Sequence, residues 1–458
     1  MVAGATMADR YDIAILGAGP AGEHAAYAQA AAGRSVLLIE RELIGGECSN
    51  WACIPTKTLL RPTEVRGESE RAAGVHEAAL DWPDLSDYRD YMTSAGDDSA
   101  RAANYDRMGV TVARGSGRLA GPGALEVDGT RYEAEQILIS TGSDPVIPPV
   151  PGLRESGYWT NREVTALHSI PDSVVIVGGG PVGIELAQFL RRFGCEVALV
   201  QGADRLAVRQ DERVSELLQR SLTDDGITIR TGRQATGVSV DGDARIVELD
   251  DGSSVRGERF VVAVGRRPRS AGIGLETIGV ELDPDRPGPI PIDEHCRVAD
   301  GVWAAGDCTG VMLFTHLGKY QARIAMADMA GRPVPADYRA IPRVIFTDPE
   351  VAAVGLSAAQ AREQGLDVAV CRFDLPSGGV ARTYTYERDP HGEMELVFDR
   401  GTRTMVGAWA VAPLASEWIH EAVLAIRARI PYEVLIDTVP QFPSFSEAYL
   451  LALLSLEL

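Results

Sequence analysis

The apolar positions of the chain fall into short runs that predict one strand–helix–strand unit twice. In the first copy, apolar runs of strand length cover 11–16 and 35–39, and an alanine-rich helical stretch covers 23–32 between them. The same order returns over 174–200, again with a glycine-rich turn between the first strand and the helix. Strands that alternate with helices are typical of a parallel sheet covered by helices. We therefore predict an α/β fold.

The rest of the chain is predicted from the same patterns. The stretch 58–113 is mostly helical in pattern, with an interruption near Trp82-Pro83, and 110–139 alternates as short strands do. Four further elements are expected, namely strands at 260–264, 302–305 and 342–346 and an amphipathic helix near 418–427. A proline-rich stretch, 148–152, indicates a linker between the two copies.

Each glycine-rich turn has the spacing of a dinucleotide-binding loop. Such glycines allow a tight turn, the approach of a pyrophosphate and close packing of helix on strand. A glycine-rich turn without a ligand is the alternative, but the flanking strands and helix favour the nucleotide. We expect the first loop to bind with Gly17, Gly19, Pro20, Ala21 and Gly22, and the second with Gly178, Gly180, Pro181, Val182 and Gly183.

The residue that ends the second strand differs between the copies. Glu40 in the first copy can accept hydrogen bonds from ribose hydroxyls. Gln201 takes its place in the second copy, which removes repulsion against a 2′-phosphate, and Arg205 and Arg209 follow closely. NADPH is therefore favoured over NADH at the second site. The alternative is that both arginines make ordinary surface ion pairs.

Two cysteines, Cys48 and Cys53, follow the first unit and precede Pro55. Residues five apart on an ideal helix lie about 8–9 Å apart, whereas a disulfide needs Cα atoms within about 7 Å. A bond between them therefore requires a distorted segment or a helix start, and Pro55 favours both. Two unrelated buried thiols are the alternative. A metal site would need two more ligands, and none is apparent nearby.

Composition excludes several classes of function. The net charge of −21 over 458 residues argues against nucleic acid and anionic membrane surfaces as partners. Six cysteines do not make a disulfide framework, and no apolar run approaches ~20 residues. Residues 1–10 lack the pattern of a signal peptide. We expect a cytoplasmic protein, in which a cysteine pair is more often catalytic or metal-binding than structural.

Seven pieces in order give a resemblance over nearly the whole chain. They are GAGPAG (17–22), GGECSNWACIPTK (45–57), TGSDP (141–145), GGGPVGIE (178–185), GRRP (265–268), AAGD (304–307) and FTDPEVAAVGL (346–356). The chain resembles the class I pyridine nucleotide–disulfide oxidoreductases, which include dihydrolipoamide dehydrogenase, glutathione reductase and mercuric reductase. The resemblance implies FAD on the first unit, NAD(P) on the second, and a C-terminal α+β domain that forms a homodimer.

This resemblance also implies domains and further binding residues. The expected domains are 1–150 and 272–338 for FAD, 151–271 for NAD(P), and 339–458 for dimerisation. The further FAD residues implied are Gly46, Lys57, Gly117, Thr141, Gly142, Asp307 and Thr315, and Gly265 and Arg266 would serve NAD(P).

The family mechanism implies roles for four residues. Hydride passes from NAD(P)H to the flavin, which reduces a Cys48–Cys53 disulfide. Cys53 lies nearer the flavin, and Cys48 attacks the substrate as a thiolate. Lys57 pairs with Glu185 and stabilises reduced flavin. Without the motif, a solvated surface lysine would be the preferred interpretation of Lys57.

The C-terminus departs from the family pattern. The family carries a His-Pro with a Glu five residues after the His, and here Phe442 stands in the place of that His, while Glu447 remains. Phenylalanine cannot carry a proton, and general acid–base catalysis contributes about 10²–10⁴-fold. His316 and Tyr320 are candidate substitutes. The C-terminal Cys pair of mercuric reductases is absent, so mercury reduction is disfavoured.

Four functions stay open at this point. The first is an NAD(P)H-dependent flavoenzyme that reduces a small disulfide or thiol conjugate through the cysteines without the usual base. The second is a diaphorase-like reductase of quinones or metal ions. The third is dihydrolipoamide dehydrogenase, which Phe442 argues against. The fourth is a redox-sensing flavoprotein without turnover, which two complete nucleotide sites disfavour.

Overall fold

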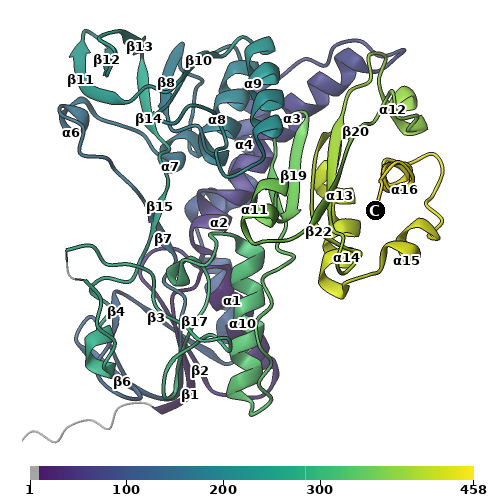
Figure 1. The fold of residues 1–458 in the computed structure, drawn as a ribbon. Helices are drawn as coiled ribbons and strands as arrows, with labels where there is room; N and C mark the ends of the chain where they lie inside the picture. Colours follow the sequence, from purple (N-terminus) through teal and green to yellow (C-terminus); the bar gives the residue numbers. More distant parts are fainter. Residues whose placement is uncertain (1–9, 284) are drawn as a thin grey trace, which may run out of the picture. The chain divides into compact units, whose positions relative to one another are not determined.

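A computed structural model describes residues 10–283 and 285–458 of the chain, and Figure 1 shows its fold. The described residues form two compact units. The first unit runs to Pro55 and takes up Asp87–Val146 and Gly265–Ala336, and the second contains Thr56–Ser86, Ile147–Val264 and Asp337–Leu458. The predicted α/β class is confirmed. The signal-peptide interpretation concerns residues 1–10, of which the structure describes only Arg10.

An eight-stranded sheet forms the centre of the first unit. Its main path has the order β16-β17-β6-β1-β2-β3, and β4 and β5 pair beside β6. The neighbours from β17 to β3 are parallel, as the sequence pattern predicts. The strands are β1 (Arg10–Leu16), β2 (Val36–Glu40), β3 (Val110–Arg114), β4 (Gly117–Leu119), β5 (Ala124–Val127), β6 (Thr130–Ile139), β16 (Arg297–Ala299) and β17 (Val302–Ala304).

The two faces of this sheet are covered differently. Side chains alternate across a strand, so Ile13 and Ile15 of β1 share one core with α1 (Pro20–Ala31) and α10 (Thr315–Met329). Ala14 and Leu16 share the opposite core with β4 and β5. The helices α1 and α10 lie side by side (Figure 1). The remaining elements of the unit are α2 (Gly46–Asn50), α5 (Ser99–Arg107), a two-stranded sheet of β7 (Ser143–Pro145) and β15 (Arg266–Pro268), and the 3₁₀ turns Ser94–Gly96, Leu275–Ile278 and Asp307–Thr309.

The region predicted as mostly helical over 58–113 contains α3 (Cys53–Arg71) and α4 (Trp82–Thr93). The helical pattern is interrupted at 72–81, next to the position near Trp82-Pro83 where the sequence predicts a break, and Trp82-Pro83 itself begins α4. Proline is well placed in the first turn, where its missing N–H would have no helical partner.

In the second unit, a parallel sheet of order β10-β9-β8-β14 repeats the strand–helix–strand pattern. A three-stranded antiparallel sheet, β11-β12-β13, packs against one of its faces. The elements are α6 (Leu153–Ser156), α7 (Asn161–Thr165), β8 (Ser173–Val177), α8 (Pro181–Arg192), β9 (Glu196–Gln201), α9 (Glu212–Asp224), β10 (Thr228–Thr231), β11 (Ala235–Asp241), β12 (Ala244–Leu249), β13 (Ser254–Gly257) and β14 (Arg259–Val262).

The C-terminal part of the second unit is a five-stranded antiparallel sheet of order β18-β19-β22-β21-β20. The helix predicted near 418–427 is present as α13 and α14, which pack with α16 on the core of this sheet. The elements are β18 (Arg343–Ile345), β19 (Glu350–Gly355), α11 (Ala358–Glu363), β20 (Val368–Asp374), α12 (Ala381–Tyr386), β21 (Glu393–Asp399), β22 (Thr404–Ala412), α13 (Ala415–Trp418), α14 (His420–Ala428), α15 (Tyr432–Ile436) and α16 (Glu447–Leu454).

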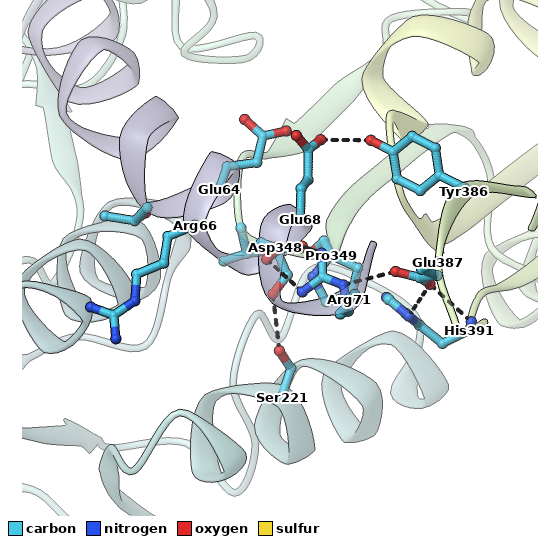
Figure 2. Close-up of polar contacts among 12 residues, drawn as sticks. Glu64, Arg66, Glu68, Arg71, Ser221, Asp348, Pro349, Tyr386, Glu387 and His391 are labelled. Carbon is cyan, nitrogen blue, oxygen red and sulfur yellow. Dashed lines mark hydrogen bonds and ion pairs between the residues drawn. The ribbon is translucent and has the colours of Figure 1, made fainter. Parts of the chain in front are cut away.

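A largely buried group of ion pairs ties three parts of the second unit together (Figure 2). Asp348 accepts two hydrogen bonds from Arg71 of α3, at 3.0 and 2.6 Å, and one from Arg192 of α8 at 2.9 Å. The Nε of Arg71 also donates to Glu387, which is paired in turn with His391. These contacts hold the end of α3 against the segment before β19 and against the segment that follows α12.

Candidate active site

The first glycine-rich loop has the shape that a dinucleotide phosphate requires. A Cβ on Gly17 would lie 2.4 Å from the backbone that follows β6, and a Cβ on Gly22 would lie 2.0 Å from the carbonyl oxygen of Gly17. Gly19 faces open space instead. Pro20 and Ala21 open α1, whose N-cap makes no side-chain hydrogen bond, so its first N–H groups point toward that space. These residues fit a bound pyrophosphate.

The second loop repeats this geometry. Gly178 and Gly183 leave no room for a Cβ, because a Cβ on them would lie 2.2 Å and 1.9 Å from backbone oxygens. Gly180 again faces open space, and Pro181 begins α8. Val182 in the first turn of α8 is 40% exposed. The second unit therefore has a glycine-rich turn of the same shape, and its binding of a phosphate stays a prediction.

Glu40 and Gln201 occupy equivalent positions. A carboxylate oxygen of Glu40 accepts from the N–H of Ala18 at 2.8 Å, and the amide oxygen of Gln201 accepts from the N–H of Gly179 at 3.0 Å. In both cases the acceptor is the strand-end side chain and the donor is the second residue of the loop. Gln201 therefore keeps the structural contact of the acid without its charge.

Arg205 and Arg209, which follow Gln201 in the sequence, differ in their hydrogen bonds and in their exposure. The guanidinium of Arg205 donates to Ser215 at 2.8 Å and to two backbone carbonyl oxygens of its own loop. Arg209 lies on the surface. Arg205 thus holds the loop together, and Arg209 is the one with an exposed side chain. A role for either in coenzyme binding stays a prediction.

The cysteine segment spans a helix start, which is the arrangement that a bond between its two cysteines would require. Cys48 lies in α2, the helix ends at Asn50, and Cys53 begins α3 after a two-residue break. The pair therefore straddles a helix start, as expected. Gly46 packs against the first loop, because a Cβ on it would lie 2.9 Å from the Cα of Gly19. The segment that carries the cysteines thus begins directly at the phosphate-binding turn.

Both cysteines are free thiols in this structure and are half-buried. The hydrogen bond from Cys53 and burial raise the pKa of the Cys48 thiol, whereas the Thr315 hydroxyl and the charge of Lys319 lower it. Thr315, the first residue of α10, has its hydroxyl 3.4 Å from the sulfur of Cys53. The adjacent thiols are therefore positioned for disulfide chemistry.

Asp307 begins the 3₁₀ turn that follows β17 in the first unit, and a serine aligns its carboxylate. Its Oδ2 accepts from the Ser143 hydroxyl at 2.7 Å, and Ser143 in turn accepts from Arg266 Nε at 2.8 Å. Burial raises the pKa of Asp307, and Ser143 and Arg266 offset part of that effect. Arg266 and Gly265, predicted to serve NAD(P), belong to the first unit, where Arg266 contacts the Asp307 group.

Three other predicted FAD residues also lie in the first unit. A Cβ on Gly117 would lie 2.6 Å from the end of the Leu16 side chain, so a larger residue there would require Leu16 to move. The Thr141 hydroxyl donates to the carbonyl oxygen of Arg269 at 2.5 Å, and Gly142 has a positive φ of 78°. Sequence reasoning assigned no role to Ser143, although it stands inside the TGSDP motif.

Sequence reasoning also missed Gln321 and Arg269. Gln321 is fully buried and accepts from the Gly306 N–H at 2.8 Å, which fixes the turn before Asp307. Arg269 pairs with Asp144 and donates to the Thr141 carbonyl oxygen. A signal for Gln321 was available in the sequence, because this polar residue stands at helical spacing between the apolar residues Leu317 and Ile324.

Lys57 lies one turn after Cys53 in α3 and has two partners. Its ammonium lies 2.6 Å from the carboxylate of Glu185, and 4.7 Å from the centre of the Phe346 ring. The other oxygen of Glu185 accepts from the N–H of Phe346 at 2.9 Å. The expected Lys57–Glu185 pair is therefore present, and Phe346 holds both members.

The C-terminal position of the family's histidine is on the surface. Phe442 is 65% exposed, and one oxygen of Glu447 is buried with no hydrogen-bond partner among the described residues. Glu421 accepts a hydrogen bond from Ser446 nearby, and burial raises the pKa of Glu421. His316 stacks on Phe314 at 5.2 Å, and the Tyr320 ring lies under Arg323 at 5.7 Å.

Comparisons with known proteins identify the family. Residues 11–332 match the pyridine nucleotide-disulphide oxidoreductase family, and residues 341–453 match its dimerisation domain. The chain therefore belongs to the class I pyridine nucleotide–disulphide oxidoreductases and is an oxidoreductase. FAD, a pyridine nucleotide, a redox-active disulfide centre and a homodimer fit this family.

Similar proteins differ in what they act on. The chain is 34% identical to a dihydrolipoyl dehydrogenase of Chlorobaculum tepidum, with 96% of each sequence covered. It is also 34% identical to a mercuric reductase of Streptomyces lividans, with 96% of the chain and 95% of the relative covered.

Two solved structures have the same fold. LpdA of Mycobacterium tuberculosis is 29% identical with a TM-score of 0.86, and 97% of the chain and 99% of LpdA are covered. RclA of Escherichia coli, a flavoprotein disulfide reductase solved with Cu(II), is 27% identical with a TM-score of 0.85, and 95% of the chain and 98% of RclA are covered.

Two features are absent from residues 10–283 and 285–458. No helix in this part of the chain is long and apolar enough to cross a membrane. No three His, Cys, Asp or Glu side chains gather there in an arrangement that could hold a metal ion.

Proposed function

We propose that the chain passes electrons from NAD(P)H through FAD to the Cys48–Cys53 pair, and from the pair to a small disulfide or thiol-conjugate substrate. The observation that carries this proposal is the adjacent pair of thiols, which straddles a helix start beside the first phosphate-binding loop. Bound FAD would supply the two-electron exchange between nicotinamide and sulfur.

The chain's own residues would carry out the sulfur chemistry. The thiolate of Cys48 attacks one sulfur of the substrate disulfide, which breaks its S–S bond, forms a mixed disulfide and releases one thiol. The thiolate of Cys53 then attacks the sulfur of Cys48, which releases the second thiol and closes the Cys48–Cys53 disulfide. Two electrons have then moved from the pair to the substrate, and two protons have gone to the products.

The absence of a histidine limits the substrates. Phe442 offers no proton at the family's acid–base position, so a leaving thiol must depart as a thiolate or take its proton elsewhere. Substrates with acidic leaving thiols are therefore favoured over lipoamide and glutathione disulfide. Lys57, which pairs with Glu185, would supply a positive charge that stabilises the reduced flavin, as the family resemblance implies.

Coenzyme choice, domain division and location belong to the same proposal. Gln201 in place of an acid supports NADPH over NADH, because no carboxylate repels a 2′-phosphate there. We retain 1–150 and 272–338 for FAD, 151–271 for NAD(P) and 339–458 for dimerisation. A cytoplasmic location and the absence of a nucleic-acid partner rest on composition.

A second candidate is reduction of metal ions directly by the reduced flavin. It is supported by the relatives named mercuric reductase and by the Cu(II) complex of RclA. In that case the cysteines would not be needed for turnover.

An anaerobic titration with NADPH and then NADH tests the proposal. A long-wavelength charge-transfer band at two-electron reduction is expected, because Cys53 as a thiolate would lie against the flavin. Cys48→Ser should abolish disulfide turnover, and Cys371→Ser, at a buried cysteine of the second unit, should not. Direct bleaching of the flavin without that band, with full turnover in Cys48→Ser, would favour the metal-ion reductase.

A further inference from the structure

The chain uses lysine at two positions only. Lys57 and Lys319 are the two lysines among its 44 basic residues, and every other basic residue is an arginine. In a chain that otherwise uses arginine, we expect lysine to stand where the local chemistry requires an ammonium group and not a guanidinium group. Lysine carries a compact point charge, whereas the planar fork of arginine favours paired contacts with carboxylates.

One lysine lies on the helix that begins with Cys53, and the other lies on the helix that begins with Thr315. Lys57 follows Cys53 by four residues in α3. Lys319 follows Thr315 by four residues in α10, and residues four apart share one face of a helix. Because the Thr315 hydroxyl lies 3.4 Å from the sulfur of Cys53, the face of α10 that carries Lys319 is the face at the cysteines.

The groups around Cys48 differ in whether they stabilise its thiolate, and Lys319 is one of those that do. The neighbouring Cys53 thiol and burial both act against a thiolate at Cys48. The groups that act for it are the Thr315 hydroxyl and the charge of Lys319. The family's histidine, which would hold positive charge beside this thiol, is replaced by Phe442.

We propose that Lys319 supplies the positive charge that stabilises the thiolate of Cys48, in place of the absent histidine. This rests on the proposed function, since the thiolate is the attacking group in that scheme. Lys319 acts as a positioning residue, because its effect on the reaction passes through Cys48. The sulfur chemistry itself is carried out by Cys48 and Cys53. The charge of Lys319 also acts on Glu23 of α1, where it lowers the pKa of the carboxyl group against the effect of burial. An arginine at 319 would pair with that carboxylate and leave less charge for the sulfur.

The test measures the thiol directly, so it does not depend on turnover. The holoenzyme is reduced with dithiothreitol, freed of it, and alkylated with iodoacetamide between pH 5 and 10, and modification at Cys48 is followed by mass spectrometry. Cys195, Cys296, Cys308 and Cys371 are buried and do not interfere. The variants are Lys319→Met, Lys319→Arg and the matched control Arg323→Met, which removes an exposed charge one turn further along α10.

Lys319→Met should slow alkylation of Cys48 at pH 7 about three- to tenfold, because removing one nearby, solvent-exposed positive charge weakens the stabilisation of a thiolate by on the order of 1 kcal/mol. The difference should fade in 1 M salt, because an exposed charge is screened. Lys319→Arg should recover part of the rate. Equal profiles for Lys319→Met and Arg323→Met would overturn the inference.

Failure of the proposed function would be distinguished by a different result. In that case NAD(P)H would leave the Cys48–Cys53 disulfide closed in the unmodified enzyme, whereas the dithiothreitol-reduced thiol would still respond to Lys319. A structural role of Lys319 would lower thermal stability without shifting the pH profile or its dependence on salt, which would also overturn the inference.

Discussion

The ion pairs around Asp348 allow a quantitative test of the fold (Figure 2). We consider Asp348→Asn, which keeps the shape of the side chain and removes its charge. The side chain is 6% exposed and accepts three hydrogen bonds from Arg71 and Arg192. After the substitution, two largely buried guanidinium groups share one carboxylate fewer.

The expected loss of stability depends on which partners Arg71 and Arg192 keep after the substitution. Removing one member of a buried ion pair costs about 3–5 kcal/mol. Here Arg71 keeps Glu387 and Arg192 keeps Asp225, and asparagine still offers one oxygen acceptor. We therefore expect a loss of about 2–4 kcal/mol in the free energy of unfolding of the second unit.

The same group makes a prediction for pH. Burial alone would raise the pKa of Asp348, but the hydrogen bond from Arg71 and the charge of Arg192 hold it below 3.8. A carboxyl whose pKa is depressed in the folded state stabilises the protein above its unfolded pKa, and this is lost as the pH falls through the folded value. The difference between wild type and Asp348→Asn should therefore be largest near pH 7 and shrink below about pH 4.

Urea unfolding at pH 7, followed by fluorescence and circular dichroism, is the assay. The midpoint should fall by about 1 M with an unchanged slope. The control is Asp241→Asn, which breaks an ion pair with Arg256. The side chains of Asp241 and Arg256 are 66% and 59% exposed, so this substitution should have no measurable effect on the urea midpoint. The reasoning is refuted if Asp348→Asn and Asp241→Asn unfold at the same urea concentration.

Three further predictions concern the same molecule. Gly→Ala usually stabilises a helix, but Gly67→Ala in α3 should lower the free energy of unfolding in urea by about 1–3 kcal/mol, because a Cβ on Gly67 would lie 2.3 Å from the carboxylate of Asp348. A gain in stability would contradict this contact. Gln201→Glu should raise KM for NADPH about tenfold and leave KM for NADH nearly unchanged, and equal changes for both would refute the coenzyme preference. Phe442→His should raise turnover of glutathione disulfide or lipoamide about tenfold or more in steady-state assays, and no gain would show that the missing histidine is not what limits those substrates.

Much of the fold could be predicted because it depends on local signals. The runs at 11–16 and 174–177 became β1 and β8, and the glycines after them form the two tight turns. The break at 72–81 lies next to the predicted position near Trp82-Pro83, although only the structure shows that Pro83 begins the second helix. The four-part domain division stays a prediction.

The candidate site divides in the same way. Cys48, Cys53 and Lys57 are within one short stretch and were predicted with their chemistry. Their partners come from elsewhere: Glu185 lies 128 residues from Lys57, and Thr315 lies 262 residues from Cys53. The family resemblance implied the pair of Lys57 with Glu185, but no pattern along the chain predicts the contact of Thr315 with Cys53.

The sequence by itself determined the two strand–helix–strand units, the phosphate-binding glycines, the cysteine pair and the loss of the histidine at Phe442. These features depend on residue type and on spacing within one or two elements, where backbone geometry is restrictive. Tertiary structure alone decided that Gln201 takes the contact of Glu40, that Thr315 reaches Cys53, and that Asp348 joins Arg71 to Arg192. Those contacts arise because packing brings distant segments together, and a buried polar group must then be satisfied by whatever side chain arrives beside it.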